Sequence, residues 1–277
     1  MSSTVNHASD ATIDLDAYLA RIGYLGERGP TVETMRGLHR AHATHIPFEN
    51  LDVLLGRPIR LDLESLQAKL VRARRGGYCF EHNLLFAAAL EQLGFRVTRL
   101  SARVRHGTDR ILPRTHMLLL LEVDGEPWIG DVGFGGWGLL EPIPLVGDRE
   151  MKQGAWTFRL RREGGGWVLQ CLESNLGLDQ YAFTLEGQLP VDYELANHYC
   201  STHPQSRFVL TLTAQLPTPA ARYILHNREF RTVDASGEHT EMVATNEALL
   251  GLLATRFGIV LPGGTVFRTA AGPVIDG

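Results

Sequence analysis

The stretch RTHMLLLLEVDGEPWIGDVGFGG, from Arg114 to Gly136, decides the fold of the middle of the chain. Two segments rich in apolar residues flank Asp124-Gly125. An Asp-Gly pair in that setting is the strongest short-range signal for a two-residue β-hairpin turn. Such a turn pairs Val123 with Glu126, and the stretch therefore predicts an antiparallel hairpin.

The register of this hairpin predicts that two titratable side chains meet. Continuing the pairing places Asp131 opposite Leu118, and His116 lies two residues away on the same strand face. Diagonal neighbours of this kind have Cα atoms about 7–8 Å apart, so their side chains can touch. A carboxylate there accepts a hydrogen bond from one ring nitrogen of the histidine and leaves the other nitrogen free to act as a base.

Outward from the hairpin, the pattern changes near residue 95. Before that point, apolar residues recur with helical spacing in segments 31–46, 62–77 and 79–94, and Thr31 and Asp62 are suitable N-caps. We therefore expect the first third of the chain to be helical.

Strand patterns dominate after residue 95. Alternating apolar residues predict strands within 96–104, 156–172, 207–216 and 222–233. Segment 245–258 returns to helical spacing and predicts a final helix.

These elements predict an α+β protein in three parts. We expect a helical bundle in residues 1–95, an antiparallel β unit in 96–200 and a smaller α/β unit in 201–277. The chain has 277 residues and is 44% hydrophobic, which is enough to bury the cores that this plan requires.

Composition narrows the classes of function. The net charge of -4 gives no basic field for nucleic acid or an anionic membrane, and no apolar run is long enough to span a bilayer. The polar first residues carry no secretory pattern, so we expect a cytoplasmic protein. Three cysteines without a CxxC pair predict neither a disulfide framework nor a cysteine-rich zinc site.

One cysteine is distinguished by its position. In ARRGGYCFEHN (Ala73–Asn83), Cys79 follows two glycines and opens a predicted helix. The N–H groups and dipole of a helix N-terminus favour a thiolate and can stabilise an oxyanion. We therefore predict that Cys79 is an activated nucleophile for acyl transfer, with His116 as its base and Asp131 as the carboxylate that orients the base.

Other interpretations of these residues stay open. Cys79 can be a packed core thiol, or it can join His82 and His116 at a metal ion, although the spacing fits no zinc motif and we expect no metal. A hydrolase or a transglutaminase-like enzyme would use the same Cys-His-Asp order for a different reaction. A non-enzymatic binding protein with a decayed site would keep the fold without the activity. Cys171 and Cys200 lie in strand-like contexts, and we expect both in the core.

Five blocks of the chain resemble those of the arylamine N-acetyltransferase family, and the stretches DVLLGRPIRLD (Asp52–Asp62) and DVGFGG (Asp131–Gly136) look closest to bacterial members. In the family's order the blocks are IPFENLD (Ile46–Asp52), RRGGYCFEHN (Arg74–Asn83), THMLLL (Thr115–Leu120), DVGFGG (Asp131–Gly136) and STHPQSRF (Ser201–Phe208).

The resemblance implies a fold and a chemistry. The fold is a helical bundle, a β-barrel and an α/β lid, with a core related to those of cysteine proteases and transglutaminases. Cys79 would accept the acetyl group of acetyl-CoA, with His116 as its base and Asp131 as the residue that orients the base. An arylamine or arylhydrazine, or the oxygen of an N-hydroxyarylamine, would then take the acetyl group in a ping-pong mechanism. Acetyl-CoA is thus a substrate, and no permanently bound cofactor is expected.

The resemblance also implies binding residues and partners. The acceptor pocket would be lined by Phe134, Tyr78, Phe208 and Phe48. The coenzyme A arm would lie near Gly133, Gly135, Gly136 and Thr115. The expected partners are acetyl-CoA and small aromatic amines or hydrazines, with no nucleic acid and no membrane, and the protein is expected to be a monomer or a homodimer.

Overall fold

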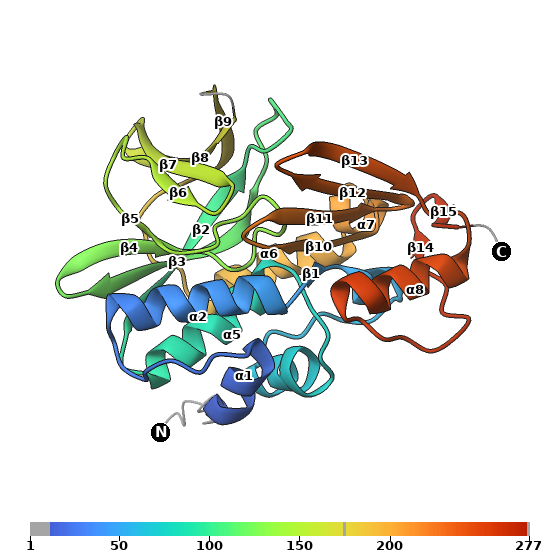
Figure 1. The fold of residues 1–277 in the computed structure, drawn as a ribbon, viewed down its shortest axis with the longest axis horizontal. Coiled ribbons are helices and arrows are strands. Elements are labelled where there is room, and N and C mark those ends of the chain that lie inside the picture. The colour runs from blue at the N-terminus through green and yellow to red at the C-terminus, as the bar shows by residue number, and fades with distance from the viewer. Residues whose placement is uncertain (1–11, 174–175, 276–277) are drawn as a thin grey trace, which may run out of the picture.

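The computed structural model describes residues 12–173 and 176–275. Helices from the first third of the chain lie beneath a β-barrel and a second sheet (Figure 1). The predicted α+β class is confirmed. The helices are α1 (Leu15–Ile22), α2 (Val32–His45), α3 (Leu51–Leu54), α4 (Leu63–Leu66), the π-helical η1 (Gln67–Arg72), α5 (Cys79–Gln92), α6 (Pro190–Thr202), α7 (Arg207–Leu210) and α8 (Asn246–Phe257).

Two N-terminal helices begin at the predicted caps. The Thr34 N–H donates to Thr31 Oγ1 at 3.2 Å where α2 begins, and the Ser65 N–H donates to Asp62 Oδ1 at 2.9 Å where α4 begins. These bonds satisfy N–H groups that a helix N-terminus leaves without a partner inside the helix. The local sequence therefore sets where these helices begin.

Antiparallel strands make up the rest of the fold. They are β1 (Phe48–Glu49), β2 (Arg96–Val104), β3 (Arg114–Val123), β4 (Glu126–Gly130), β5 (Ile143–Pro144), β6 (Met151–Gln153), β7 (Trp156–Glu163), β8 (Gly166–Glu173), β9 (Leu176–Phe183), β10 (Thr213–Pro217), β11 (Ala221–His226), β12 (Glu229–Asp234), β13 (Gly237–Met242), β14 (Arg268–Thr269) and β15 (Gly272–Pro273).

The hairpin of β3 and β4 has the predicted register. Val123 pairs with Glu126 across a two-residue turn. Asp124 and Gly125 have φ values of 54° and 78°, as a type I′ hairpin turn requires at its two central positions.

Eight strands, in the order β5-β4-β3-β2-β9-β8-β7-β6, form a near-closed antiparallel barrel. After β5 the chain turns back onto β7, where the Asp148 N–H donates to the Leu160 carbonyl at 2.7 Å. Leu118, Ile129 and Phe158 are among the buried side chains of the barrel core. Helix α5 packs against β2 and β3, so its first residue lies beside the start of β3.

The second sheet has the order β1-β10-β11-β12-β13, and α8 packs against it. Its first strand comes from the N-terminal third of the chain, because Phe48 of β1 pairs with Gln215 of β10. The N-terminal and C-terminal parts are therefore joined by backbone pairing. The division at residues 95 and 200 stays a prediction.

The structure corrects two expectations. Segment 207–216 is a strand only from Thr213, because its first residues form α7. Ser206 caps that turn by accepting the Phe208 N–H at 3.2 Å, a local bond that competes with strand formation. Cys200 lies in helix α6 and not in a strand, since Pro190 at the first helical position favours a helix start there.

Candidate active site

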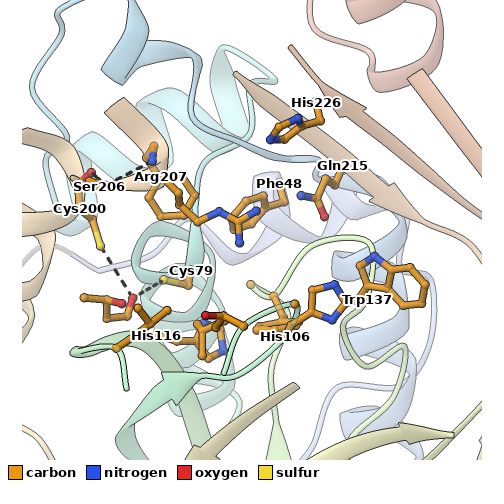
Figure 2. Close-up of a pocket in the computed structure, with 18 of the residues that line it drawn as sticks. Phe48, Cys79, His106, His116, Trp137, Cys200, Ser206, Arg207, Gln215 and His226 are labelled. Atoms are coloured by element: carbon orange, nitrogen blue, oxygen red, sulfur yellow. Dashed lines mark hydrogen bonds between the residues drawn. The ribbon is translucent and has the colours of Figure 1, made fainter. Parts of the chain in front are cut away.

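A cavity of about 460 Å³ opens between the barrel, the start of α5, and the C-terminal sheet (Figure 2). Cys79 and His116 both contribute to its lining, as do residues of α6, α7, β10 and β11. The cavity is therefore built from all three parts of the chain, and the predicted nucleophile and base lie at its wall.

Cys79 is the first residue of α5, as the sequence predicts, and its side chain is buried. Its Sγ lies 3.5 Å from the carbonyl oxygen of Thr115. The helix start is held by Glu81, whose Oε2 accepts the Tyr78 N–H at 3.0 Å and whose Oε1 pairs with Lys69 Nζ at 2.7 Å. Cys79 therefore sits on a rigid element at a defined distance from β3.

His116 and Asp131 meet as the hairpin register predicts. His116 Nε2 donates to Asp131 Oδ2 at 2.7 Å, and both side chains are almost fully buried. The imidazole also lies close enough to the sulfur of Cys79 for each group to shift the pKa of the other. Because Nε2 is engaged by Asp131, Nδ1 is the ring nitrogen left for the thiol.

Asn83 fixes the carboxylate from the side opposite the histidine. Its Nδ2 donates to Asp131 Oδ1 at 3.0 Å and to the Met117 carbonyl at 2.8 Å. The Gly133 N–H also donates to Asp131 Oδ1, at 2.9 Å. Our sequence reasoning missed Asn83, although a signal was present: Asn83 is four residues after Cys79 and so lies on the same helix face.

Burial and neighbouring charges shift the pKa values of Cys79, His116 and Asp131 in opposite directions. Burial raises the pKa of the Cys79 thiol, against the hydrogen bond and charge of His116. Burial acts to lower the pKa of His116, but Asp131 and Cys79 outweigh it and raise the pKa to about 10. Burial also acts to raise the pKa of Asp131, yet the charge of His116 and the hydrogen bonds from His116, Asn83 and Gly133 hold that pKa below its usual range. The thiol and the imidazole thus titrate as a coupled pair in which Asp131 favours the imidazolium.

Most of the predicted binding residues reach the cavity. Its lining includes Thr115, Gly133, Phe134, Phe48 and Phe208. The ring of Phe134 lies 5.0 Å from the centroid of His116 in an edge-to-face contact. An apolar, aromatic wall therefore adjoins the catalytic side chains predicted from the sequence.

Three predicted binding residues lie behind that wall. Tyr78 is fully buried, its hydroxyl hydrogen-bonds to Asn197, and its ring packs 5.2 Å from that of Phe208. Gly135 and Gly136 are also absent from the lining, and the Gly136 N–H donates to Gln215 Oε1 at 2.8 Å. These three residues support the lining and do not form it.

Several lining residues were not predicted from the sequence. The most prominent are basic side chains from separate elements, among which Arg207 and His226 point into the cavity in Figure 2. Burial and the charges of Arg207 and other arginines lower the pKa of His106. Among the described residues that line the cavity, none is acidic. The outer part of the cavity therefore favours an anion, and no local sequence pattern signals it because these residues are far apart in the chain.

The metal interpretation finds no support in the position of His82. Its Nε2 lies 3.1 Å from the Pro47 carbonyl oxygen and its Nδ1 lies 3.0 Å from His42 Nε2, so both ring nitrogens are engaged away from Cys79. Among the described residues, no cluster of three or more His, Cys, Asp or Glu side chains could hold a metal ion. Within the same ranges, no helix has the length and apolar character needed to cross a membrane.

The fold and the site together define a class. A cysteine at a helix N-terminus, a histidine bonded to a buried carboxylate and a cavity with aromatic walls are the features of an enzyme that transfers acyl groups through a thiol.

Comparison with known proteins identifies the family within that class. A family described as N-acetyltransferase matches residues 31–266. The chain is 41% identical over 250 residues to the arylamine N-acetyltransferase / N-hydroxyarylamine O-acetyltransferase of Salmonella typhimurium, with 88% of each chain covered. The chain belongs to the arylamine N-acetyltransferase family.

Solved structures agree with this assignment. The arylamine N-acetyltransferase of M. tuberculosis superposes with a TM-score of 0.86 at 39% identity, covering 89% of this chain and 94% of that one. The Mycobacterium marinum enzyme in complex with CoA superposes with a TM-score of 0.85 at 36% identity, covering 89% and 93%. The three-part fold is therefore that of the family.

Proposed function

We propose that this chain is an arylamine N-acetyltransferase that carries the acetyl group of acetyl-CoA on Cys79 as a thioester. The observation that supports this most directly is the hydrogen bond of 2.7 Å between His116 and Asp131, beside a Cys79 thiol whose pKa His116 acts to lower. Membership of the family supports the donor and the acceptor class, since one relative is known in complex with CoA.

In the first half-reaction, His116 takes the proton of Cys79 and the thiolate attacks the thioester carbonyl of acetyl-CoA. Asp131 stabilises the imidazolium that forms, as in other triads. The N–H groups of the first turn of α5 face the developing oxyanion and supply its hydrogen bonds. The coenzyme then leaves as a thiol with the proton from His116. One thioester is exchanged for another, so the acetyl group stays reactive.

In the second half-reaction, the amine of the acceptor attacks the acetyl carbon. His116 accepts the proton of the amine, and Cys79 leaves as a thiolate. One site thus serves two substrates in turn, which gives ping-pong kinetics. The N-hydroxyarylamine activity named for the Salmonella relative uses an oxygen nucleophile, and the same acetyl-enzyme would react with it.

The lining suggests how the two substrates are held. Phe134, Phe48 and Phe208 offer aromatic surfaces to a flat acceptor, and Tyr78 supports them from behind. Thr115 and Gly133 adjoin Cys79, where the donor must pass, and Gly135 and Gly136 shape the same loop. The basic side chains at the outer part of the cavity suit the phosphates of a coenzyme. A cytoplasmic location and a monomeric or homodimeric state stay predictions.

Intact-protein mass spectrometry after brief exposure to acetyl-CoA tests the proposal. The protein should gain one acetyl group, peptide mapping should place it on Cys79, and an arylamine chase should remove it. Cys79→Ser should abolish turnover, whereas Cys171→Ser should acetylate normally because Cys171 is buried in the barrel core. A label on Cys171 or Cys200 would overturn the assignment, and no mass gain at all would favour the hydrolase alternative.

A further inference from the structure

Cys200 is a second thiol at the same cavity wall. Its Sγ lies 3.9 Å from the carbonyl oxygen of Thr115, the atom that lies 3.5 Å from the Sγ of Cys79. Figure 2 shows Cys79 and Cys200 on either side of this shared oxygen, each joined to it by a dashed line. Two thiols that come from different helices thus converge on one atom.

The two thiols differ in their surroundings. Cys79 has His116 nearby, whose charge acts to lower the pKa of the thiol and whose ring can take its proton, so Cys79 is the thiol that can react as a thiolate. Burial raises the pKa of Cys200 to about 12, so this thiol keeps its proton at neutral pH. Both are buried against bulk solvent yet line the cavity through which substrates reach Cys79. One thiol is thus reactive, and the other is a protonated neighbour that shares its access route.

We propose that Cys200 is the resolving thiol for an oxidised Cys79, so that a hydroperoxide inactivates the enzyme reversibly through a Cys79–Cys200 disulfide. The inference rests on the proposed function only in taking Cys79 as the reactive thiolate.

The chemistry needs one hydroperoxide and no other oxidant. The Cys79 thiolate attacks the outer oxygen of the hydroperoxide, the O–O bond breaks, and the alcohol or water leaves with the proton of His116. Cys79 is then a sulfenic acid and the hydroperoxide has been reduced by two electrons. The sulfur of Cys200 attacks that of Cys79, an S–S bond forms, and the hydroxyl leaves as water with the thiol proton of Cys200. An external dithiol restores both thiols by exchange.

The position of Cys200 allows the approach that this step needs. A disulfide requires the two sulfurs to close to about 2.05 Å, so one side chain must move toward the other. Cys200 lies in the last turn of α6, which ends at Thr202, so the movement required is confined to the end of that helix. Cys171 cannot substitute for it, because Cys171 is fully buried in the barrel core.

The test treats reduced wild type, Cys200→Ser and the matched control Cys171→Ser with hydrogen peroxide and then with dithiothreitol. Activity is expressed relative to each protein's own value before oxidation. Wild type and Cys171→Ser should lose activity, lose the mass of two hydrogen atoms, yield a peptide pair linked through Cys79 and Cys200, and regain most of their activity. Cys200→Ser should gain two or three oxygen atoms on Cys79 and stay inactive after reduction.

Two further measurements make the result decisive. The linked peptide pair is sought in wild type itself, so the inference can be tested even if Cys200→Ser folds poorly. Prior loading with acetyl-CoA should protect Cys79 from the peroxide, because the thioester has no free thiolate.

Equal recovery of wild type and Cys200→Ser, or no linked pair in oxidised wild type, would overturn the inference. If acetyl-CoA still acetylates Cys79 in that case, only the disulfide inference has failed. Absence of acetylation in the reduced enzyme would instead count against the proposed function.

Discussion

Replacing Asp131 with asparagine changes which ring nitrogen of His116 carries the proton, and so whether His116 can accept the proton of Cys79. In the native site, Asp131 Oδ1 accepts hydrogen bonds from Asn83 Nδ2 at 3.0 Å and from the Gly133 N–H at 2.9 Å. Those two donors require an oxygen, so the amide of the asparagine must keep its oxygen there. Its NH₂ group then faces Nε2 of His116, where the native carboxylate oxygen accepts.

The expected loss is large because the substitution has two effects. A donor opposite Nε2 forces that nitrogen to accept, so Nδ1 carries the proton and cannot take the one on Cys79. The carboxylate charge that favours the imidazolium is also lost. The pKa of His116 is raised from 6.5 to about 10, and losing that rise corresponds to about 5 kcal/mol. If Asp131 causes most of it, the rate falls by about 10³–10⁴-fold, comparable with the same change in a serine triad.

The assay measures alkylation of Cys79 by a neutral reagent as a function of pH, next to kcat/KM for acetylation. In Asp131→Asn, alkylation at neutral pH should slow and its apparent pKa should rise, because the imidazolium no longer stabilises the thiolate. Circular dichroism and thermal unfolding of both proteins serve as controls for folding. Unchanged alkylation together with retained turnover would refute the orienting role of Asp131.

Three further outcomes are expected. Phe134→Ala should weaken arylamine use more than acetylation of Cys79 in single-turnover measurements, and equal losses would assign Phe134 to the fold alone. Gly133→Ala should lower both the reaction rate and the stability measured by unfolding. The added Cβ would lie 2.8 Å from the Cα of Cys79, a backbone atom that can move only if helix α5 shifts. Burial lowers the pKa values of His39 and His82 to about 4, so their contribution to the stability measured by denaturant unfolding should be full above pH 6.5 and fall as the pH drops toward 4. Each histidine contributes on the order of 3 kcal/mol to that loss, and a flat profile would contradict it.

The sequence predicts the parts of the site that local rules control. The Asp-Gly turn and the two-residue period of strands were sufficient to bring His116 next to Asp131. The same kind of rule failed for Cys200, because a thiol carries no helix or strand signal and its helix begins ten residues earlier, at Pro190. The sequence left open whether Cys79 is buried, since its burial depends on α6 and the C-terminal sheet closing over the site.

Asn83 explains why a nucleophile on a helix and a base on a strand keep their alignment. Its side chain bonds to the backbone of β3 through the Met117 carbonyl and to the Asp131 carboxylate, and its Oδ1 accepts the Val132 N–H at 3.2 Å. All the hydrogen-bonding groups of this buried amide face the hairpin, while its backbone belongs to the helix that begins with Cys79. Any sliding of α5 along β3 would leave these buried groups without partners, at about 1–3 kcal/mol for each. The hydrogen bonds that orient Asp131 therefore also hold Cys79 in register with His116.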